Sequence, residues 1–405
     1  MAVGPGTLPE FHPVAGFKLG TASAGIKTPG RKDLVLMEIP VGASVAGVFT
    51  KNAFCAAPVQ ICKRHMELAS ARYLVVNTGN ANAGTGQEGW DDAALTCKSV
   101  GDMMGVSDAE VLPFSTGVIG EKLPVEKIVA ALPAAKDALS ENGWDEAASG
   151  ILTTDTRPKG ASEQFEYNGK TITVTGISKG SGMIKPNMAT MLGYVATDAE
   201  IDQALLQALL TDSTNQSFNR ITVDSDTSTN DSCILVATGA SGVKVDSEDL
   251  DLLDKFTEVL DRVMRDLAHA IVRDGEGATK FVTVKVESAA QQDEALAVAF
   301  DIAHSPLVKT ALFASDPNWG RILAVVGRAG VENLDLEALK IFLGDVCIVE
   351  NGGRAASYTE EAGQAVMDQE EITIRVVLNR GDVEETVWTT DLSQEYVSIN
   401  ADYRS

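Results

Sequence analysis

The sequence is poor in the residue types that build disulfide frameworks and metal centres. It has five cysteines and four histidines among 405 residues. The cysteines form no CxxC pair and no short array, which favours reduced thiols over a disulfide scaffold. No His/Cys cluster has the spacing of a zinc site, so we expect no metal. A chain of this length buries enough surface to fold without disulfide bonds or a structural metal ion.

Positive charge and long apolar runs are also scarce. Lysine and arginine total 33 against 57 acidic residues, which gives a net charge of −24. Such a field repels phosphate backbones and anionic lipid surfaces, so neither nucleic acid nor a membrane is an expected partner. The uncharged stretch Ile39–Thr50 is too short to span a bilayer. The first basic residue is Lys18, so we expect no secretory signal and a cytoplasmic location.

Apolar runs and helical periodicity alternate along the chain, which predicts a layered α/β fold. The predicted strands are Asp33–Ile39, Arg72–Asn77, Lys170–Thr175, Cys233–Thr238, Lys280–Glu287, Arg321–Gly327 and Glu371–Leu378. The predicted helices are Asp91–Met104, Val125–Leu139 (bent or ended by Pro133), Ile201–Asp212, Glu248–Val272 and Ala289–His304.

A glycine-rich segment follows the predicted strand Lys170–Thr175. Its first residues, Gly176 to Gly180, match the G-x-S-x-G pattern around a nucleophilic Ser178. That pattern requires a helix directly after the serine, whereas more glycines and Pro186 follow here. A base would have to come from His269 or His304. A serine hydrolase therefore stays an alternative, as does a plain surface loop.

A second polar segment, Asp224–Asp231, resembles the start of a calcium-binding loop. It lacks the central glycine, and its twelfth position is Leu235 instead of a bidentate glutamate. We therefore expect a polar turn without an ion.

Lys179–Leu192, with the sequence KGSGMIKPNMATML, resembles the cleavage-site motif of the glutamate N-acetyltransferase/ornithine acetyltransferase family of arginine biosynthesis. Further segments resemble that family in the same order, so that the resemblance spans nearly the whole chain. They are Thr21–Lys27, Val76–Gly84, Ser115–Gly120, Thr153–Thr156, Arg273–Lys280, Ser315–Arg321 and Ser398–Ser405.

The resemblance implies self-cleavage between Ala189 and Thr190, which gives an α chain of residues 1–189 and a β chain of residues 190–405. Thr190 is then the nucleophile at the new N-terminus. A threonine hydroxyl needs a base, and the α-amine released by the cut, with an ordinary pKa of about 7.7–8.0, supplies one on the same residue. This chemistry needs no catalytic histidine.

The resemblance also implies the other site residues. Thr116 and Gly117 would supply a hydroxyl and a backbone N–H to the oxyanion, although residues 115–117 alone predict a turn after the strand-like 111–114. The implied substrate contacts are Thr153 (or its neighbour Thr154), Lys179, Thr190, Glu276, Asn400 and Ser405. A lysine suits a carboxylate, and a glutamate suits the ammonium group of ornithine.

The function implied by this resemblance is acetyl transfer from N-acetylornithine to glutamate through an acetyl-Thr190 intermediate, without a cofactor. Acetyl-CoA is a possible second donor, and the expected assembly is an α₂β₂ tetramer of the cleaved chains. Two alternatives stay open, a hydrolase or aminopeptidase of related self-cleaving fold and a non-catalytic acidic binding protein.

Overall fold

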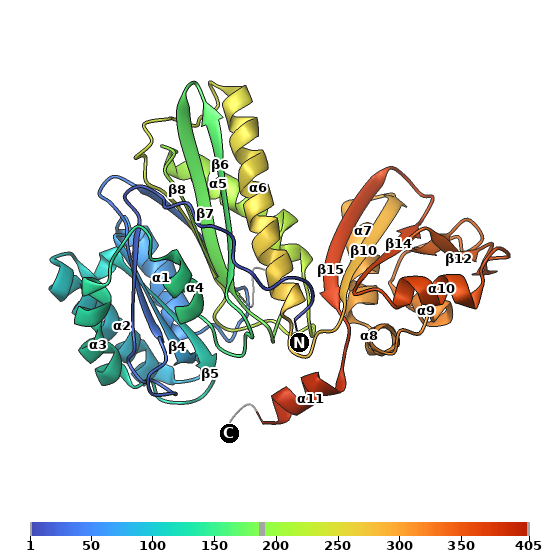
Figure 1. The fold of residues 1–405 in the computed structure, drawn as a ribbon, viewed down its shortest axis with the longest axis horizontal. Coiled ribbons are helices and arrows are strands. Elements are labelled where there is room, and N and C mark those ends of the chain that lie inside the picture. Colours follow the sequence, from blue (N-terminus) through green and yellow to red (C-terminus); the bar gives the residue numbers. More distant parts are fainter. Residues whose placement is uncertain (1, 186–190, 403–405) are drawn as a thin grey trace. The chain divides into compact units, whose positions relative to one another are not determined.

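A computed structural model describes residues 2–185 and 191–402, and element labels follow Figure 1. The chain divides into two compact units. The larger unit holds residues 7–219 and 226–271, and the smaller unit holds the N-terminal residues to Gly6, residues 220–225 and the chain from Val272 onward. The expected cleavage would divide the sequence at a different place, between residues 189 and 190, than the boundaries of these units. The division into an α chain and a β chain therefore stays a prediction. Each of the five cysteines is a free thiol, as their spacing predicts.

Two sheets form the centre of the larger unit. The four-stranded sheet has the order β1 (Lys18–Ala22), β2 (Leu34–Glu38), β4 (Tyr73–Asn80) and β5 (Val111–Val118). The five-stranded sheet has the order β3 (Ser44–Phe49), β9 (Ser232–Ala237), β8 (Leu192–Thr197), β7 (Lys170–Lys179) and β6 (Lys159–Tyr167). The pairs β4/β5 and β8/β9 run parallel, and the other neighbours run antiparallel.

Helices pack around the two sheets in the larger unit. They are α1 (Ala57–Leu68), α2 (Gly86–Met104), α3 (Val125–Asp137), α4 (Trp144–Gly150), α5 (Gln203–Gln216) and α6 (Leu250–Arg273). Helix α4 lies against the apolar cluster between the sheets. The described chain also has two single-turn 3₁₀ helices, Asp108–Glu110 and Phe218–Arg220.

The central strands of the larger unit are buried on both faces, whereas the edge strand β6 has exposed residues. Val35 of β2 packs with Ile177 of β7 between the sheets, whereas Leu34 packs on the opposite face with Cys97 of α2 and Ile128 of α3. Helix α6 lies along β6 and β7 on the far side of the second sheet (Figure 1). The layers therefore run helix, sheet, sheet, helix, which confirms the predicted layered α/β class.

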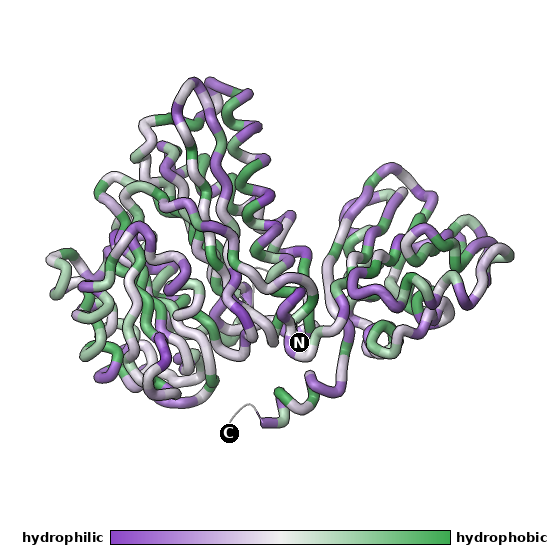
Figure 2. Tube along the Cα trace, viewed as in Figure 1, coloured by the Kyte–Doolittle hydropathy of each residue, from purple (hydrophilic) through white to green (hydrophobic). Residues whose placement is uncertain are grey.

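Helix α6 confirms the strongest periodic signal in the sequence. Phe256, Leu260, Val263 and Leu267 fall at steps of three and four, and all are fully buried. Figure 2 shows hydrophobic and hydrophilic residues alternating along this helix. The amphipathic pattern, with one stripe facing the sheet, accounts for its position.

The smaller unit has one six-stranded sheet with helices packed on it. Its order is β13 (Gly353–Arg354), β12 (Val346–Glu350), β11 (Lys340–Leu343), β14 (Glu371–Val377), β10 (Phe281–Ala289) and β15 (Val383–Thr390). Its helices are α7 (Gln292–His304), α8 (Pro306–Phe313), α9 (Trp319–Arg328), α10 (Glu360–Met367) and α11 (Gln394–Ala401). Helices α7 and α9 share one buried apolar cluster with the strands.

Two local predictions were wrong. The predicted strand Arg321–Gly327 lies inside helix α9, where Ile322, Val325 and Val326 form a buried face, because a short apolar run fits either state. Residues 115–117 continue strand β5 instead of forming a turn. Of the two effects predicted for Pro133, an end of the helix is excluded, because α3 runs on to Asp137, and a bend stays a prediction.

Among the described residues, no single helix has both the length and the apolar content of a membrane span. The bent pair α7 and α8, with 57° between its two helices, reaches that length and composition when taken together.

Candidate active site

The parallel pair β4/β5 presents Thr116 and Gly117 at its end. Thr116 is buried, and Gly117 has a φ of +138°, a conformation that L side chains rarely adopt. A Cβ at residue 117 would lie 2.3 Å from the carbonyl carbon of Gly79 and 2.5 Å from the nitrogen of Asn80. The strand therefore requires glycine at this position, and backbone packs directly against backbone there.

Lys179 brings two other predicted residues together. It is the last residue of β7, and its Nζ donates to the hydroxyl of Thr116 at 3.1 Å and to the hydroxyl of Thr153 at 3.1 Å. Only 9% of Lys179 is exposed. A buried ammonium group is thus held between two hydroxyls from separate parts of the chain, which places a positive charge inside an acidic protein.

The structure distinguishes the two adjacent threonines at 153 and 154. Thr153 contacts the Lys179 ammonium group, whereas the Thr154 hydroxyl pairs with the hydroxyl of Ser181 at 2.7 Å. Of the two threonines left open by the sequence, Thr153 is therefore the one beside the cluster of Thr116 and Lys179.

Sequence reasoning missed Asp155, a buried carboxylate that hydrogen-bonds next to the cluster of Thr153 and Lys179. Its Oδ1 accepts from Lys159 Nζ at 2.6 Å and from the Gly180 N–H at 2.7 Å, and its Oδ2 accepts from the Thr153 N–H at 3.0 Å. Burial favours the neutral acid, but the charges of Lys159 and Lys179 outweigh it and hold the pKa of Asp155 below its ordinary range. Asp155 thus ties the loop of Thr153 to the end of β7.

Asp231 is a second buried carboxyl near Lys179, and sequence reasoning assigned it only to a polar turn. Burial raises its pKa well above the ordinary value, and the charge of Lys179 opposes that rise. The pKa of Asp155 is therefore lowered and that of Asp231 is raised, although both carboxyl groups lie near Lys179. The difference arises because Asp155 also pairs with the ammonium group of Lys159.

Glu276 and Asn400 meet within the smaller unit. The Asn400 Nδ2 donates to Glu276 Oε2 at 2.7 Å and to the Tyr396 carbonyl at 3.0 Å. Glu276 lies in the connection between α6 and β10 and is 7% exposed, and Asn400 lies on α11. Two of the predicted substrate contacts, 124 residues apart in the chain, are therefore neighbours.

Three predicted residues lie outside the described residues. They are the two residues of the expected cleavage site, Ala189 and Thr190, and the C-terminal Ser405.

The nucleophilic role considered for Ser178 is contradicted by its surroundings. Ser178 lies within β7 and is fully buried, and its hydroxyl donates to the Leu267 carbonyl at 3.3 Å. The strand continues through Lys179, so the sharp turn that exposes a nucleophilic serine is absent at this described position. The described residues hold no group of three or more His, Cys, Asp or Glu side chains that could bind a metal.

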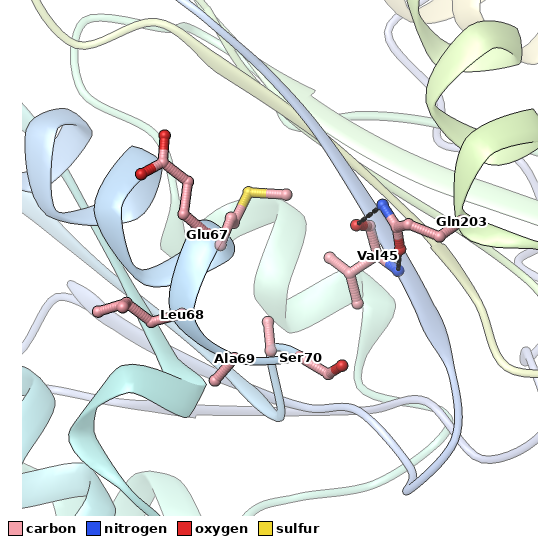
Figure 3. Close-up of a pocket in the computed structure, with 8 residues that line it drawn as sticks. Val45, Glu67, Leu68, Ala69, Ser70 and Gln203 are labelled. Atoms are coloured by element: carbon pink, nitrogen blue, oxygen red, sulfur yellow. Dashed lines mark hydrogen bonds between the residues drawn. The ribbon is translucent and has the colours of Figure 1, made fainter.

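A cavity of about 460 Å³ opens between the end of α1 and strand β3 (Figure 3). Its lining includes Val45, Leu68, Ser70 and Gln203, and none of the predicted site residues. Gln203 already exchanges two hydrogen bonds with the Val45 backbone, at 2.8 and 3.2 Å. We therefore assign the candidate active site to the cluster around Lys179 and not to this cavity.

Comparison with known proteins gives a family and several relatives. The sequence model of the ArgJ family matches residues 18–405. Arginine biosynthesis bifunctional protein ArgJ of Pseudomonas fluorescens (strain Pf0-1) is 62% identical over 406 residues, and the match covers 100% of each chain.

Two solved structures are also similar. A crystal structure of Arginine biosynthesis bifunctional protein ArgJ from Bacillus halodurans is 40% identical, with a TM-score of 0.49; the match covers 51% of this chain and 97% of that one. A crystal structure of ornithine acetyltransferase from Mycobacterium tuberculosis, complexed with ornithine, is 33% identical with a TM-score of 0.38, over 43% of this chain and 93% of that one.

Proposed function

This chain belongs to the ArgJ family, and we propose on that premise that it transfers an acetyl group from N-acetylornithine to glutamate in arginine biosynthesis. The products are ornithine and N-acetylglutamate. The relatives that match over their full length are named as bifunctional arginine biosynthesis proteins, which supports this assignment.

The observation that carries the proposal is the meeting of Lys179, Thr116 and Thr153. Lys179 donates to both hydroxyls, so the Thr116 hydroxyl uses its oxygen as an acceptor and keeps its own proton to donate. In our proposal that proton and the Gly117 N–H stabilise the oxyanion of the acetyl group. Fixed donors in a buried site contribute about 2.7–4 kcal/mol each to such a transition state.

The proposed nucleophile is Thr190, the first residue of the β chain after cleavage at Ala189. Lys179 and Leu192 are directly paired across β7 and β8. Residue 190 precedes Leu192 by two residues in the sequence. This short tether supports a site in which Thr190 and the Lys179 cluster act together.

The proposed reaction has two halves. The Thr190 hydroxyl attacks the acetyl carbonyl of N-acetylornithine and passes its proton to the α-amine of the same residue. The amide C–N bond then breaks, and ornithine leaves with that proton. In the second half the glutamate amine attacks the acetyl ester, the C–O bond breaks, and the proton returns to the Thr190 oxygen.

The proposed substrate contacts outside the larger unit are Glu276, Asn400 and Ser405. The buried Glu276 carboxylate is suited to the side-chain ammonium of ornithine, and Asn400 orients it through the 2.7 Å hydrogen bond. The remaining proposals follow the family resemblance, namely an α₂β₂ assembly in the cytoplasm, no bound cofactor, and acetyl-CoA as a possible alternative donor.

The test is acetyl transfer from N-acetylornithine to glutamate by wild type, Thr190→Ala and Thr190→Ser. We expect Thr190→Ala to stay a single uncut chain and to show no acetyl transfer. Thr190→Ser should keep part of the self-cleavage and part of the acetyl transfer. Thr211→Ala, which removes a helix hydroxyl from α5, is the matched control and should be fully active. Transfer by an uncut Thr190→Ala chain would overturn the assignment.

A further inference from the structure

Two successive residues, Asn230 and Asp231, connect both parts of the proposed site, and the function proposed above gives neither of them a role. Both are buried, with 7% and 3% of their surface exposed. They precede β9 directly, so their backbone is fixed by the sheet that holds β8.

The Asn230 side chain holds the strand that carries the oxyanion donors. Its Nδ2 donates to the Ala81 carbonyl at 2.6 Å and to the Ser115 carbonyl at 2.9 Å. The Ser115 carbonyl belongs to the peptide unit that also contains the Thr116 nitrogen. One amide group therefore fixes the end of β5 and the chain that follows β4.

The Thr229 hydroxyl donates to Asn230 Oδ1, which sets the orientation of that amide. The two N–H groups then point to the two carbonyls, and no hydroxyl or carboxylate could replace both donors. The geometry at this position thus depends on a side chain with two donors on one nitrogen.

The Asp231 side chain holds the start of β8. One oxygen of its carboxyl group accepts from the backbone N–H of Met191 and from the Ser228 hydroxyl, whereas its Oδ2 is buried without a hydrogen-bond partner. The next backbone nitrogen, that of Ser232, donates to the Met191 carbonyl at 3.0 Å. Met191 is therefore held at both its N–H and its carbonyl by residues 231 and 232.

Met191 follows the proposed nucleophile directly in the chain. Its nitrogen forms the peptide bond to residue 190. A contact that fixes the Met191 N–H therefore limits where the attacking residue and its amine can lie.

We propose that Asn230 and Asp231 are positioning residues of the transfer reaction. Asn230 fixes the strand of Thr116 and Gly117, Asp231 fixes the chain next to the nucleophile, and their adjacency sets the spacing between the oxyanion donors and the attacking oxygen. This inference rests on the function proposed above. A displacement of about 1 Å in such a spacing costs on the order of 10²-fold in rate.

The first test compares Asn230→Ala with Asn142→Ala, an exposed control, by steady-state kinetics on the cleaved protein. We expect Asn230→Ala to lower kcat about 10²-fold and to change the KM for N-acetylornithine less than about threefold, because it moves the oxyanion strand and touches no substrate. Asn142→Ala should match wild type. A wild-type kcat in Asn230→Ala, or a change confined to KM, overturns the inference.

The second test uses Asp231, because Asn230→Ala could also fail to fold. Asp231→Asn keeps an oxygen that accepts the Met191 N–H, whereas Asp231→Ala has none. We expect Asp231→Asn to retain kcat within about tenfold of wild type and Asp231→Ala to lose about 10²-fold, at equal unfolding temperatures. Equal kcat in the two variants overturns the positioning role.

The two proposals fail in different ways. If wild type shows no transfer, or Thr190→Ala remains active, the proposed function fails and the inference falls with it. If wild type is active through Thr190 while Asn230 and Asp231 tolerate alanine, only the inference fails.

Discussion

The side chains of Glu276 and Asn400 are joined by a 2.7 Å hydrogen bond, although 124 residues separate them in the chain. Asn400 lies on α11, the last helix, so the pairing brings the C-terminal segment onto the loop that follows α6. The Asn400 amide carries no charge, so this hydrogen bond by itself does not neutralise the Glu276 carboxylate.

Glu276→Gln should impair the use of N-acetylornithine. Loss of the charge removes the proposed partner of the ornithine ammonium group, and a hydrogen bond to a charged group contributes about 1.5–3 kcal/mol. We expect kcat/KM for N-acetylornithine to fall by roughly 10²-fold, and that of Asn400→Ala to fall less. Steady-state kinetics checks this, with Glu395→Gln, on the exposed part of α11, as the control. An unchanged kcat/KM in Glu276→Gln would remove this residue from the site.

Gly117→Ala should abolish transfer and destabilise the larger unit. The added Cβ would lie 2.3 Å from the Gly79 carbonyl carbon, so the oxyanion strand has to move. Gly120→Ala is the matched control, because Gly120 also has a positive φ, of +82°, but no atom within 4 Å of a Cβ. We expect Gly120→Ala to lose about 1–2 kcal/mol from backbone strain alone. Gly117→Ala should lose more stability than this because of the added clash, and only this variant should lose activity by 10²-fold or more. Denaturant unfolding and the transfer assay separate the two effects, and equal activity in the two variants would contradict the role of Gly117.

Asp155→Asn should change how stability depends on acid. The pKa of Asp155 is lowered in the folded protein, so its carboxylate contributes stability that is complete above the unfolded pKa of about 3.9. That contribution is lost as the pH falls from about 5 toward the lower folded pKa. We expect the unfolding midpoint of wild type to fall more steeply over this range than that of Asp155→Asn. Parallel acid dependences in urea titrations would show that the buried ion pair with Lys159 contributes no such linkage.

Ser178→Ala should leave acetyl transfer within about twofold of wild type. The Ser178 hydroxyl is buried and donates to the Leu267 carbonyl, so its loss costs only a hydrogen bond of about 1 kcal/mol. A serine-directed phosphonate should not label this residue in the folded protein. Loss of transfer together with labelling of Ser178 would instead favour the hydrolase alternative.

The strands and helices that bury one or two regular faces could be predicted from the sequence. Helix α6 follows its three-and-four spacing, and β2, β4 and β9 follow their apolar runs. Helix α9 was missed because seven residues such as 321–327 carry no periodicity that separates a strand from a buried helix. Its Asn318 cap, which accepts from the Arg321 N–H at 3.1 Å, was the local signal for a helix.

The site was predictable only where a motif marks it. Thr116, Thr153 and Lys179 come from three distant segments, and the structure brings them together around one ammonium group. Asp155 lies in one of those segments, but nothing local shows that it accepts from Gly180. Asn230 looked like part of a polar turn, because its partners Ala81 and Ser115 are 149 and 115 residues away. Long-range pairings of this kind leave no periodic trace in a single sequence.

The measurement that tests the account most directly is intact mass spectrometry of the purified protein, denatured before and after brief exposure to N-acetylornithine. The account predicts two chains, one ending at Ala189 and one beginning at Thr190, with a single acetyl group added to the second chain after exposure. Added glutamate should remove that acetyl group. A single chain of 42.7 kDa that takes up no acetyl group, while transfer proceeds, would contradict it.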